Sequence, residues 1–195
     1  MLWEVEIFPQ GPDAERLRVA EEYELLTHAG HAGAEAVQKT SRGFLLQGDL
    51  TRAHVEQLAN ELLVDPVAET GEIHGTNARG EIECAAATVL LKPGVMDPVA
   101  MSVMQTARQL GIPVDAAQTF RRYFWTGKPF DREAMCRKVL CNEAIERVLE
   151  HPLSESALGL GTHYAFQRIV VPLCNLVDAG LVKLSKDGQL SLSLD

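Results

Sequence analysis

The sequence predicts an α+β fold built from two copies of one unit, and three observations lead to this prediction. Segments 3–13 and 87–97 share one order: a β-type run, a Pro/Gly turn and an aspartate that opens a helical pattern. The two aspartates, Asp13 and Asp97, are 84 residues apart (97 − 13), and further matches follow them in order. Strand-like and helix-like patterns alternate in the same sequence in both halves, which is typical of an internal repeat.

The correspondence continues along the chain with a smaller offset, as expected if the loops of the second copy are shorter. At an offset of 80, four residues lie opposite four others: Gln38, Arg42, Phe44 and Leu45 opposite Gln118, Arg122, Phe124 and Trp125. At an offset of 77 the matched sets are Leu58, Leu62, Leu63 and Asp65, opposite Met135, Val139, Leu140 and Asn142. The conserved order of these pairings favours duplication.

The first half begins as a strand followed by a helix. Residues 3–8 alternate apolar and acidic side chains, which predicts a half-buried strand. Asp13 is a good N-cap, because its carboxylate can accept hydrogen bonds from the first turn of the helix that follows. The Ala/Gly-rich stretch 28–33 ends that helix.

Two short strands, a second helix and a closing strand complete the first half. Residues 37–40 and 44–47 predict strands around a turn at 41–43. Apolar residues at helical spacing then predict a helix: Val55, Leu58, Ala59, Leu62 and Leu63. Residues 67–73 are expected to form the closing strand.

The second half follows the same plan. A strand at 88–91 precedes Asp97-Pro98, which supplies an N-cap and a proline at the first helical position. Gly111 ends the helix, residues 119–126 form an aromatic hairpin, and Asp131 caps the next helix. Residues 144–149 are expected to be the closing strand by analogy with 67–73, although periodicity alone also allows a helix.

This order of elements is the β-α-β-β-α-β, or ferredoxin-like, unit. Its sheet has one bare face, so we expect two units to pack their antiparallel sheets against each other. The predicted organisation is repeat 1 at 1–74, a linker at 75–84, repeat 2 at 85–152 and a further segment at 153–195. The last segment contains a turn at Asp178-Ala179-Gly180 and a strand-like alternation at 189–194.

Composition argues against several classes of function. The 195 residues include 27 acidic and 18 basic side chains, for a net charge of −9. Nucleic-acid binding requires Lys and Arg that replace counterions, and an anionic membrane surface also attracts basic proteins. No run approaches the roughly 20 apolar residues of a membrane span. We therefore expect a cytoplasmic protein with reduced, structural thiols at Cys84, Cys136, Cys141 and Cys174.

Segment 88–98, with the sequence Thr-Val-Leu-Leu-Lys-Pro-Gly-Val-Met-Asp-Pro, carries a family resemblance. Its opening strand, Lys-Pro-Gly turn and Asp-Pro helix start resemble the phosphoribosylformylglycinamidine synthase family, namely the small PurS-type component and the matching N-terminal region of the large enzyme. Asn142 and the tail 184–194 are similar to later landmarks of that family. The first repeat departs from the pattern, with Phe8-Pro9-Gln10-Gly11 in place of the Lys-Pro-Gly turn.

The resemblance implies a role in purine biosynthesis. The family transfers ammonia from glutamine to formylglycinamide ribonucleotide with ATP, so the full enzyme is a carbon–nitrogen ligase that uses ATP and Mg. PurS-type units pair and bridge the synthetase and glutaminase parts. For this chain the resemblance therefore implies an assembly module, with 153–195 leading toward a synthetase domain and with no catalytic, cofactor-binding or metal-binding residue of its own. The alternative is a ferredoxin-like, small-molecule-sensing regulatory domain.

The best candidate for a contact with a ligand or partner is a cluster of basic and aromatic residues. Arg121 and Arg122 stand beside Tyr123, Phe124 and Trp125, and such a cluster can bind phosphate or stack on a base. Because alternate residues of a strand face opposite sides of the sheet, aromatics in the interior with arginines at the rim are the competing explanation. We select Arg121, Arg122 and Trp125 as possible contact residues.

Two weaker motifs have a structural explanation. His28 and His31 lack the further ligands that a zinc site needs. The Gly159-x-Gly161 motif lacks the remaining residues of a phosphate-binding loop, so a connecting loop is the preferred interpretation.

Overall fold

The computed structural model describes residues 1–28, 36–75, 86–150, 168, 173 and 176–188. The chain divides into two compact units, Met1–Thr162 and His163–Asp195, which are described separately. The first unit has an α+β fold with one open antiparallel sheet of six strands, in the order β3-β1-β2-β5-β4-β6. The α+β prediction is confirmed at this level.

The elements of the first unit follow the same order in both halves. The first half contains β1 (Leu2–Pro9), α1 (Ala14–Thr27), β2 (Val37–Gly48), α3 (Arg52–Leu58), the π-helical η1 (Ala59–Leu63) and β3 (Glu69–Gly75). The second half contains β4 (Ala86–Leu91), α4 (Pro98–Gln109), β5 (Val114–Trp125), α5 (Arg132–Ala134), the π-helical η2 (Met135–Leu140) and β6 (Glu146–Glu150). The closing strands predicted at 67–73 and 144–149 are therefore confirmed as β3 and β6.

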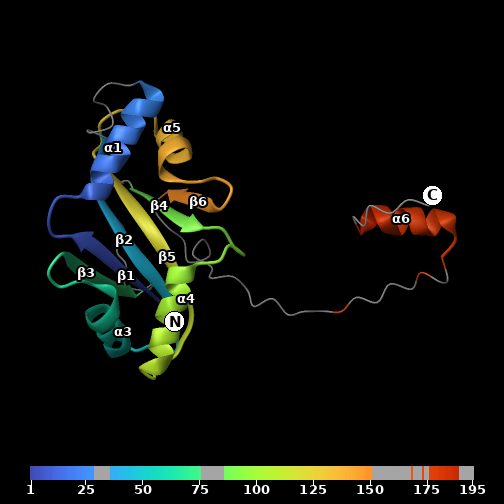
Figure 1. Ribbon diagram of the computed structural model, residues 1–195, viewed down its shortest axis with the longest axis horizontal. Helices are drawn as coiled ribbons and strands as arrows, with labels where there is room; N and C mark the ends of the chain where they lie inside the picture. The colour runs from blue at the N-terminus through green and yellow to red at the C-terminus, as the bar shows by residue number, and fades with distance from the viewer. Residues whose placement is uncertain (29–35, 76–85, 151–167, 169–172, 174–175, 189–195) are drawn as a thin grey trace. The chain divides into compact units, whose positions relative to one another are not determined.

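The two halves join edge to edge, so the expected packing of one sheet against another is wrong. Strands β2 and β5 pair antiparallel over almost their whole length in the middle of the sheet. Arg42 lies directly opposite Arg121 in this pairing. Figure 1 shows the resulting single sheet, with α1 and α4 crossing the same face.

Each predicted pair of short inner strands is one long strand. The turn expected at 41–43 lies in the interior of β2, and the hairpin expected at 119–126 is the second half of β5. The sequence predicts Gly43 as a turn residue, but it lies within the sheet, where its lack of a side chain allows other atoms to approach closely. A Cβ atom there would lie 2.2 Å from the Val5 carbonyl oxygen and 2.5 Å from Cζ of Phe120.

Matching hydrogen bonds identify the equivalent residues of the two halves. The Asp13 carboxylate accepts from the backbone N–H of Arg16 and from the backbone N–H and hydroxyl of Thr40. Asp97 accepts from Ala100 and, in the same two ways, from Thr119. Thr40 is thus equivalent to Thr119, an offset of 79 (119 − 40), and the offset of 80 predicted for this strand is wrong by one residue.

This error of one residue in the alignment matters because neighbouring side chains of a strand point to opposite faces of the sheet. Arg42 corresponds to Arg121 rather than to Arg122, and Gly43 corresponds to Arg122. The pairing of Pro9 with Pro93 is also wrong. The Gln10 N–H donates to the Ala68 carbonyl, and the Lys92 N–H donates to the Ile145 carbonyl in the same way, so Gln10 and Lys92 are equivalent. The turn from Lys92 to Asp97 is therefore two residues longer than the turn from Gln10 to Asp13.

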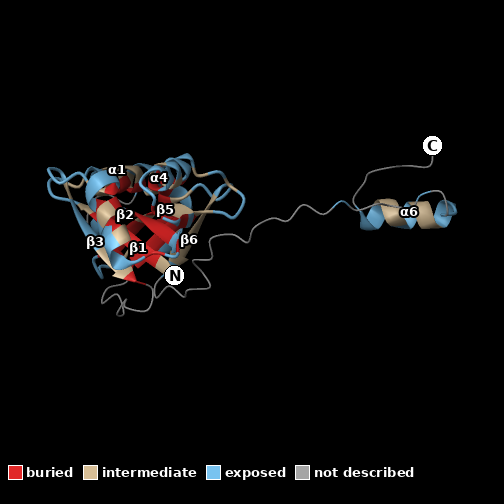
Figure 2. Cartoon of the chain, turned by 90° about the horizontal axis from the view of Figure 1, so that it is seen from below, coloured by how far each residue is buried: buried red, intermediate tan, exposed pale blue. Residues whose placement is uncertain are grey.

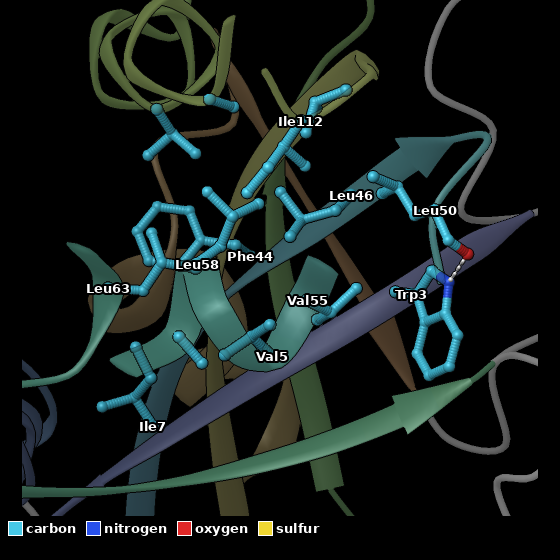
Figure 3. Close-up of a cluster of buried hydrophobic side chains, with 14 residues drawn as sticks. Trp3, Val5, Ile7, Phe44, Leu46, Leu50, Val55, Leu58, Leu63 and Ile112 are labelled. Atoms are coloured by element: carbon cyan, nitrogen blue, oxygen red, sulfur yellow. Dashed lines mark hydrogen bonds between the residues drawn. The ribbon is translucent and has the colours of Figure 1, made fainter. Parts of the chain in front are cut away.

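The hydrophobic cores draw on both halves. One core combines β1, β2, α3 and η1 of the first half with Val103 and Ala107 of α4. A second core combines β4, β5 and η2 of the second half with Val19 and Tyr23 of α1. Figure 3 shows part of the first core, where the Trp3 indole donates to the Leu50 carbonyl. Each half therefore completes the other, and the segment boundaries at 1–74 and 85–152 do not separate two independent cores.

The long helices begin and end where the sequence indicates. Asp13 and Asp97 are N-caps, and Gly111, with φ of +73°, follows α4. In the second unit, α6 (Asp178–Asp187) begins at the Asp178-Ala179-Gly180 segment that was expected to be a turn. Its N–H groups at Gly180 and Leu181 donate to the Val177 carbonyl, so this segment is the first helical turn. The strand-like alternation at 189–194 lies outside the described residues.

Replacing Asp13 or Asp97 by alanine is expected to destabilise the protein by about 2 kcal/mol in each case. Either change removes an N-cap and also leaves the N–H and hydroxyl of Thr40 or Thr119 without the carboxylate acceptor. Chemical denaturation would measure the loss. Asp131→Ala is the control, because Asp131 caps α5 through Ala134 in an exposed position and should cost about 1 kcal/mol or less. Equal losses of stability for all three variants would contradict a stabilising contribution from the contacts of Asp13 with Thr40 and of Asp97 with Thr119.

Candidate functional site

The structure separates the three residues chosen from the sequence. Arg121 points to the helix-covered side of the sheet, where it meets the end of η2. Arg122 lies on the opposite side and is fully buried. Trp125 is buried in the second core, with its ring centroid 5.1 Å from that of Phe130. They do not form one site, and whether any of them contacts a partner stays a prediction.

Arg122 is the centre of a buried charged cluster on the open side of the sheet. Its Nη1 lies 2.7 Å from Glu4 Oε1 and 2.7 Å from Glu6 Oε2, and its Nε donates to the Thr88 hydroxyl. The guanidinium also lies 4.7 Å from the Phe120 ring centroid. The cluster links β5 across β2 to β1, and the small Gly43 lies between them. Such a network joins the two halves by charge as well as by packing.

Arg121 and Arg42 are a matched pair of structural contacts. Arg42 donates to Glu69 and to the Leu63 carbonyl at the end of η1. Arg121 donates to Glu146 and to the Leu140 carbonyl at the end of η2. Both guanidinium groups are partly exposed, at 48% and 38% of the side chain. Each holds the end of a π-helix against the neighbouring strand.

A cavity of about 320 Å³ lies beside this arginine pair. Arg42, Arg121 and Glu146 give it a polar part, while Phe44, Val99 and other side chains form apolar walls. The arginines are held by carboxylates, so their charge is largely compensated within the site.

A second cavity, of about 460 Å³, lies at the end of β1. Phe8, Lys39, Thr40 and Glu72 are among the residues that line it. The volume is within the range of small-molecule sites. The offset of 80 predicted for this strand places Lys39 opposite Thr119, but the Asp–Thr contacts show that its counterpart is Gln118.

Apolar side chains are exposed at equivalent positions of the two long helices. Leu17 of α1 and Met101 of α4 are 50% and 56% exposed, and both lie four residues after the N-cap. Leu26 and Leu110 also correspond and are 48% and 40% exposed. Figure 2 shows the exposed outer sides of α1 and α4 above the buried sheet. A pair of equivalent apolar positions on one layer suits contact with another protein surface.

The cysteines and histidines give no sign of redox or metal chemistry among the described residues. Burial raises the pKa of the Cys136 thiol to about 11, and burial also raises that of Cys141. Both thiols are therefore protonated near neutral pH and are poor nucleophiles. Cys84, Cys174, His31 and the Gly159-x-Gly161 motif lie outside the described residues. Within the described residues, no three His, Cys, Asp or Glu side chains are grouped as metal ligands.

Glu15, in the first turn of α1, is a titratable group that links this helix to β5. Burial raises its pKa, but hydrogen bonds from Arg18 and Tyr123 and the charge of Arg18 outweigh this effect, so the net pKa is lowered. The Tyr123 hydroxyl donates to Glu15 over 2.7 Å. Burial in turn raises the pKa of Tyr123, so the phenol stays protonated as the donor.

We expect the stabilisation from Glu15 to be lost in acid. A lowered pKa in the folded state means that the contribution is present above the unfolded-state pKa, near 4.5, and disappears as the pH falls through the folded-state value. Glu15→Gln should therefore flatten the pH dependence of stability below about pH 4.5. Urea denaturation between pH 2.5 and 7 would measure it. An unchanged acid slope in this variant would refute the assignment, and Tyr123→Phe should flatten the slope only in part.

No family model matches the chain, and a search of curated proteins finds no match. Among the described residues no helix is both long and apolar enough to cross a membrane. Evidence about function therefore comes from the chain's own residues and their arrangement.

Proposed function

We propose that this chain is a non-catalytic assembly module of the phosphoribosylformylglycinamidine synthase type, which holds the synthetase and glutaminase parts of that enzyme together. Its halves would be PurS-like repeats, each a variant of the ferredoxin-like unit in which the two inner strands have merged into one. In this role the chain acts in purine biosynthesis in the cytoplasm. The ATP, Mg and catalytic groups would belong to the partner parts.

The observation that carries this proposal is the matched exposure of apolar residues on α1 and α4. Both helices are fixed by the same Asp–Thr contacts to neighbouring strands of one sheet, so their outer sides form a firm platform. Leu17 and Met101 occupy the same position in the two helices and are half exposed. Neither side chain belongs to a hydrophobic core, yet the position is apolar in both halves. Contact with a partner protein is the best explanation for this. The Lys-Pro-Gly turn adds support from the resemblance.

Reconstitution tests the proposal. The chain would be combined with the synthetase and glutaminase parts of the enzyme from the same genome, and ATP- and glutamine-dependent amidation of formylglycinamide ribonucleotide would be measured. We expect no turnover by the chain alone, and turnover by the mixture only when the chain is present. Turnover by the chain alone, or full activity of the partners without it, would overturn the proposal.

A pair of surface variants locates the contact. Leu17→Glu combined with Met101→Glu should weaken assembly at least tenfold while leaving the melting temperature of the isolated chain unchanged. Leu25→Glu is the control, because Leu25 is 72% exposed and its counterpart in α4 is the polar Gln109. Assembly that is weakened equally by both variants would argue against the matched positions as the contact.

The second candidate is a small-molecule-sensing regulatory module, which the 460 Å³ cavity favours. It predicts a saturable rise in melting temperature with a metabolite, because a ligand that binds only the folded state stabilises it. A thermal-shift screen of amino acids and nucleotides would measure this effect, and the absence of any shift would remove its support.

A further inference from the structure

We propose that the 460 Å³ cavity at the end of β1 is a binding site for a small anion, a carboxylate or phosphate group, with the Lys39 ammonium as its main contact. The site depends on local geometry alone. It would therefore bind an anion whether the chain acts as an assembly module or as a sensor.

The backbone forms the cavity where β1 and β2 stop running side by side, while β1 and β3 remain paired. The last residue pair between β1 and β2 is Ile7 with Arg42, so the start of β2 extends beyond the end of β1. The register of β2 against β5 shifts between Val37 and Lys39, which makes Gln38 the extra residue of a bulge. Bulges redirect side chains and are common beside functional sites. Gln38 and Lys39 line the cavity that results.

Two aromatic rings hold the Lys39 ammonium in place. Its Nζ lies 4.5 Å from the ring centroid of Phe8 and 4.6 Å from that of Phe124. The rings attract the cation only weakly at an exposed site. An ammonium has three N–H donors, and none of the described carboxylates forms an ion pair with Lys39. An ammonium with unused donors at a cavity is suited to an anion.

The second half closes the equivalent position in a different way. Gln118 is the counterpart of Lys39, and its side-chain amide donates to the Leu91 carbonyl over 2.9 Å. Leu91 corresponds to Pro9, which lines the cavity in the first half. Where the second half has an internal hydrogen bond, the first half thus has a positive charge. The positive charge of Lys39 is therefore specific to the cavity of the first half and is not needed to form the equivalent strand in the second half.

Two acidic residues also line the cavity, and neither cancels the charge of Lys39. The Asp13 carboxylate already accepts from the N–H of Arg16 and from the N–H and hydroxyl of Thr40. Glu72 is 59% exposed and lies 3.4 Å from His74 Nε2. The ammonium of Lys39 is therefore the charged group in the lining with capacity for a ligand.

Titration of the full chain followed by ¹⁵N–¹H NMR tests the site. Inorganic phosphate, sodium glutamate and sodium chloride would be added separately at matched ionic strength. We expect saturable shifts at Gln38, Lys39 and Gly71 with phosphate or with glutamate, and the stronger of the two identifies the type of anionic group. No saturable shift there with either anion, or the same shifts with chloride, would overturn the proposal.

Charge variants give the second measurement. Lys39→Gln, which copies the residue of the second half, should weaken binding at least tenfold, and Lys39→Arg should retain it. Lys138→Gln is the matched control, because it removes one positive charge from an exposed position in η2 outside the cavity lining. Unchanged binding by Lys39→Gln, with the melting temperature retained, would refute the role of the ammonium.

Discussion

Arg122→Met is expected to destabilise the protein by about 3–5 kcal/mol, the largest effect of any single charge change in the described residues. The side chain has no exposed surface, and its Nη1 lies within 2.7 Å of both Glu4 and Glu6. Methionine fills a similar volume but leaves the two carboxylates buried without this cation. Urea or guanidinium denaturation of the purified variant would measure the loss.

The companion experiment separates the charge from the packing. Combining Arg122→Met with Glu4→Gln and Glu6→Gln removes the charges on both sides, and this triple variant should recover a substantial part of the stability. If the triple variant is as unstable as Arg122→Met alone, the loss comes from packing against Phe120 and not from uncompensated charge. Arg137→Met is a suitable reference, because Arg137 forms ion pairs only at the exposed surface.

Gly43→Ala is expected to cost at least about 3 kcal/mol, although it adds a single methyl group. The new Cβ would lie 2.2 Å from the Val5 carbonyl oxygen and within 2.7 Å of two atoms of the Phe120 ring. A ring can shift, but the carbonyl belongs to the backbone of β1, so the pairing of β1 with β2 has to open. Loss of amide protection in β1 together with a lower denaturation midpoint would show this.

Gly11→Ala is the control for Gly43→Ala. No atom lies within 4 Å of the position that its Cβ would take. The substitution should change stability by less than about 1 kcal/mol, and with a favourable sign if it only restricts the unfolded chain. Similar losses at both positions would mean that the cost at Gly43 is not steric.

The matching order of elements in the two halves could be predicted from the sequence because it depends on helix signals. Asp13 and Asp97 each precede a regular apolar pattern, and an N-cap is a local feature that the chain carries wherever it packs. The offset of 77 between the second helices is also supported, since Asp65 and Asn142 make the same side-chain contacts at 67 and 144. The strand predicted at 144–149 by analogy with 67–73 is confirmed as β6.

The strands were harder to predict because their signals depend on distant contacts. Gly43 is a turn residue by composition, yet it is needed for the approach of Phe120 from the other half. Glu4 and Glu6 predict a strand exposed on one side, but both carboxylates are buried and paired with Arg122, which reaches them across β2. No pattern within residues 2–9 contains that partner, which is 118 residues from Glu4.

The candidate site residues show the same limit. Arg121, Arg122 and Trp125 are neighbours in the sequence, but the strand places them on different sides and in different surroundings. No pattern within residues 37–47 marks Lys39 as a site residue, because Phe8 and Phe124, the rings beside its ammonium, come from two other strands. The register given by the Asp–Thr contacts places Lys39 opposite Gln118 in the comparison of the halves.

The exchange of long helices between the two cores bears on how the protein is made in the cell. During synthesis the first half leaves the ribosome before α4 exists, and its core still lacks Val103 and Ala107. Neither core can close until most of the second half has been translated, so the nascent chain carries an incomplete apolar surface for that time. The fold depends on contacts between residues that are far apart in the sequence and are synthesised at different times. We therefore expect both halves to fold together after β5 has been synthesised, and not one after the other.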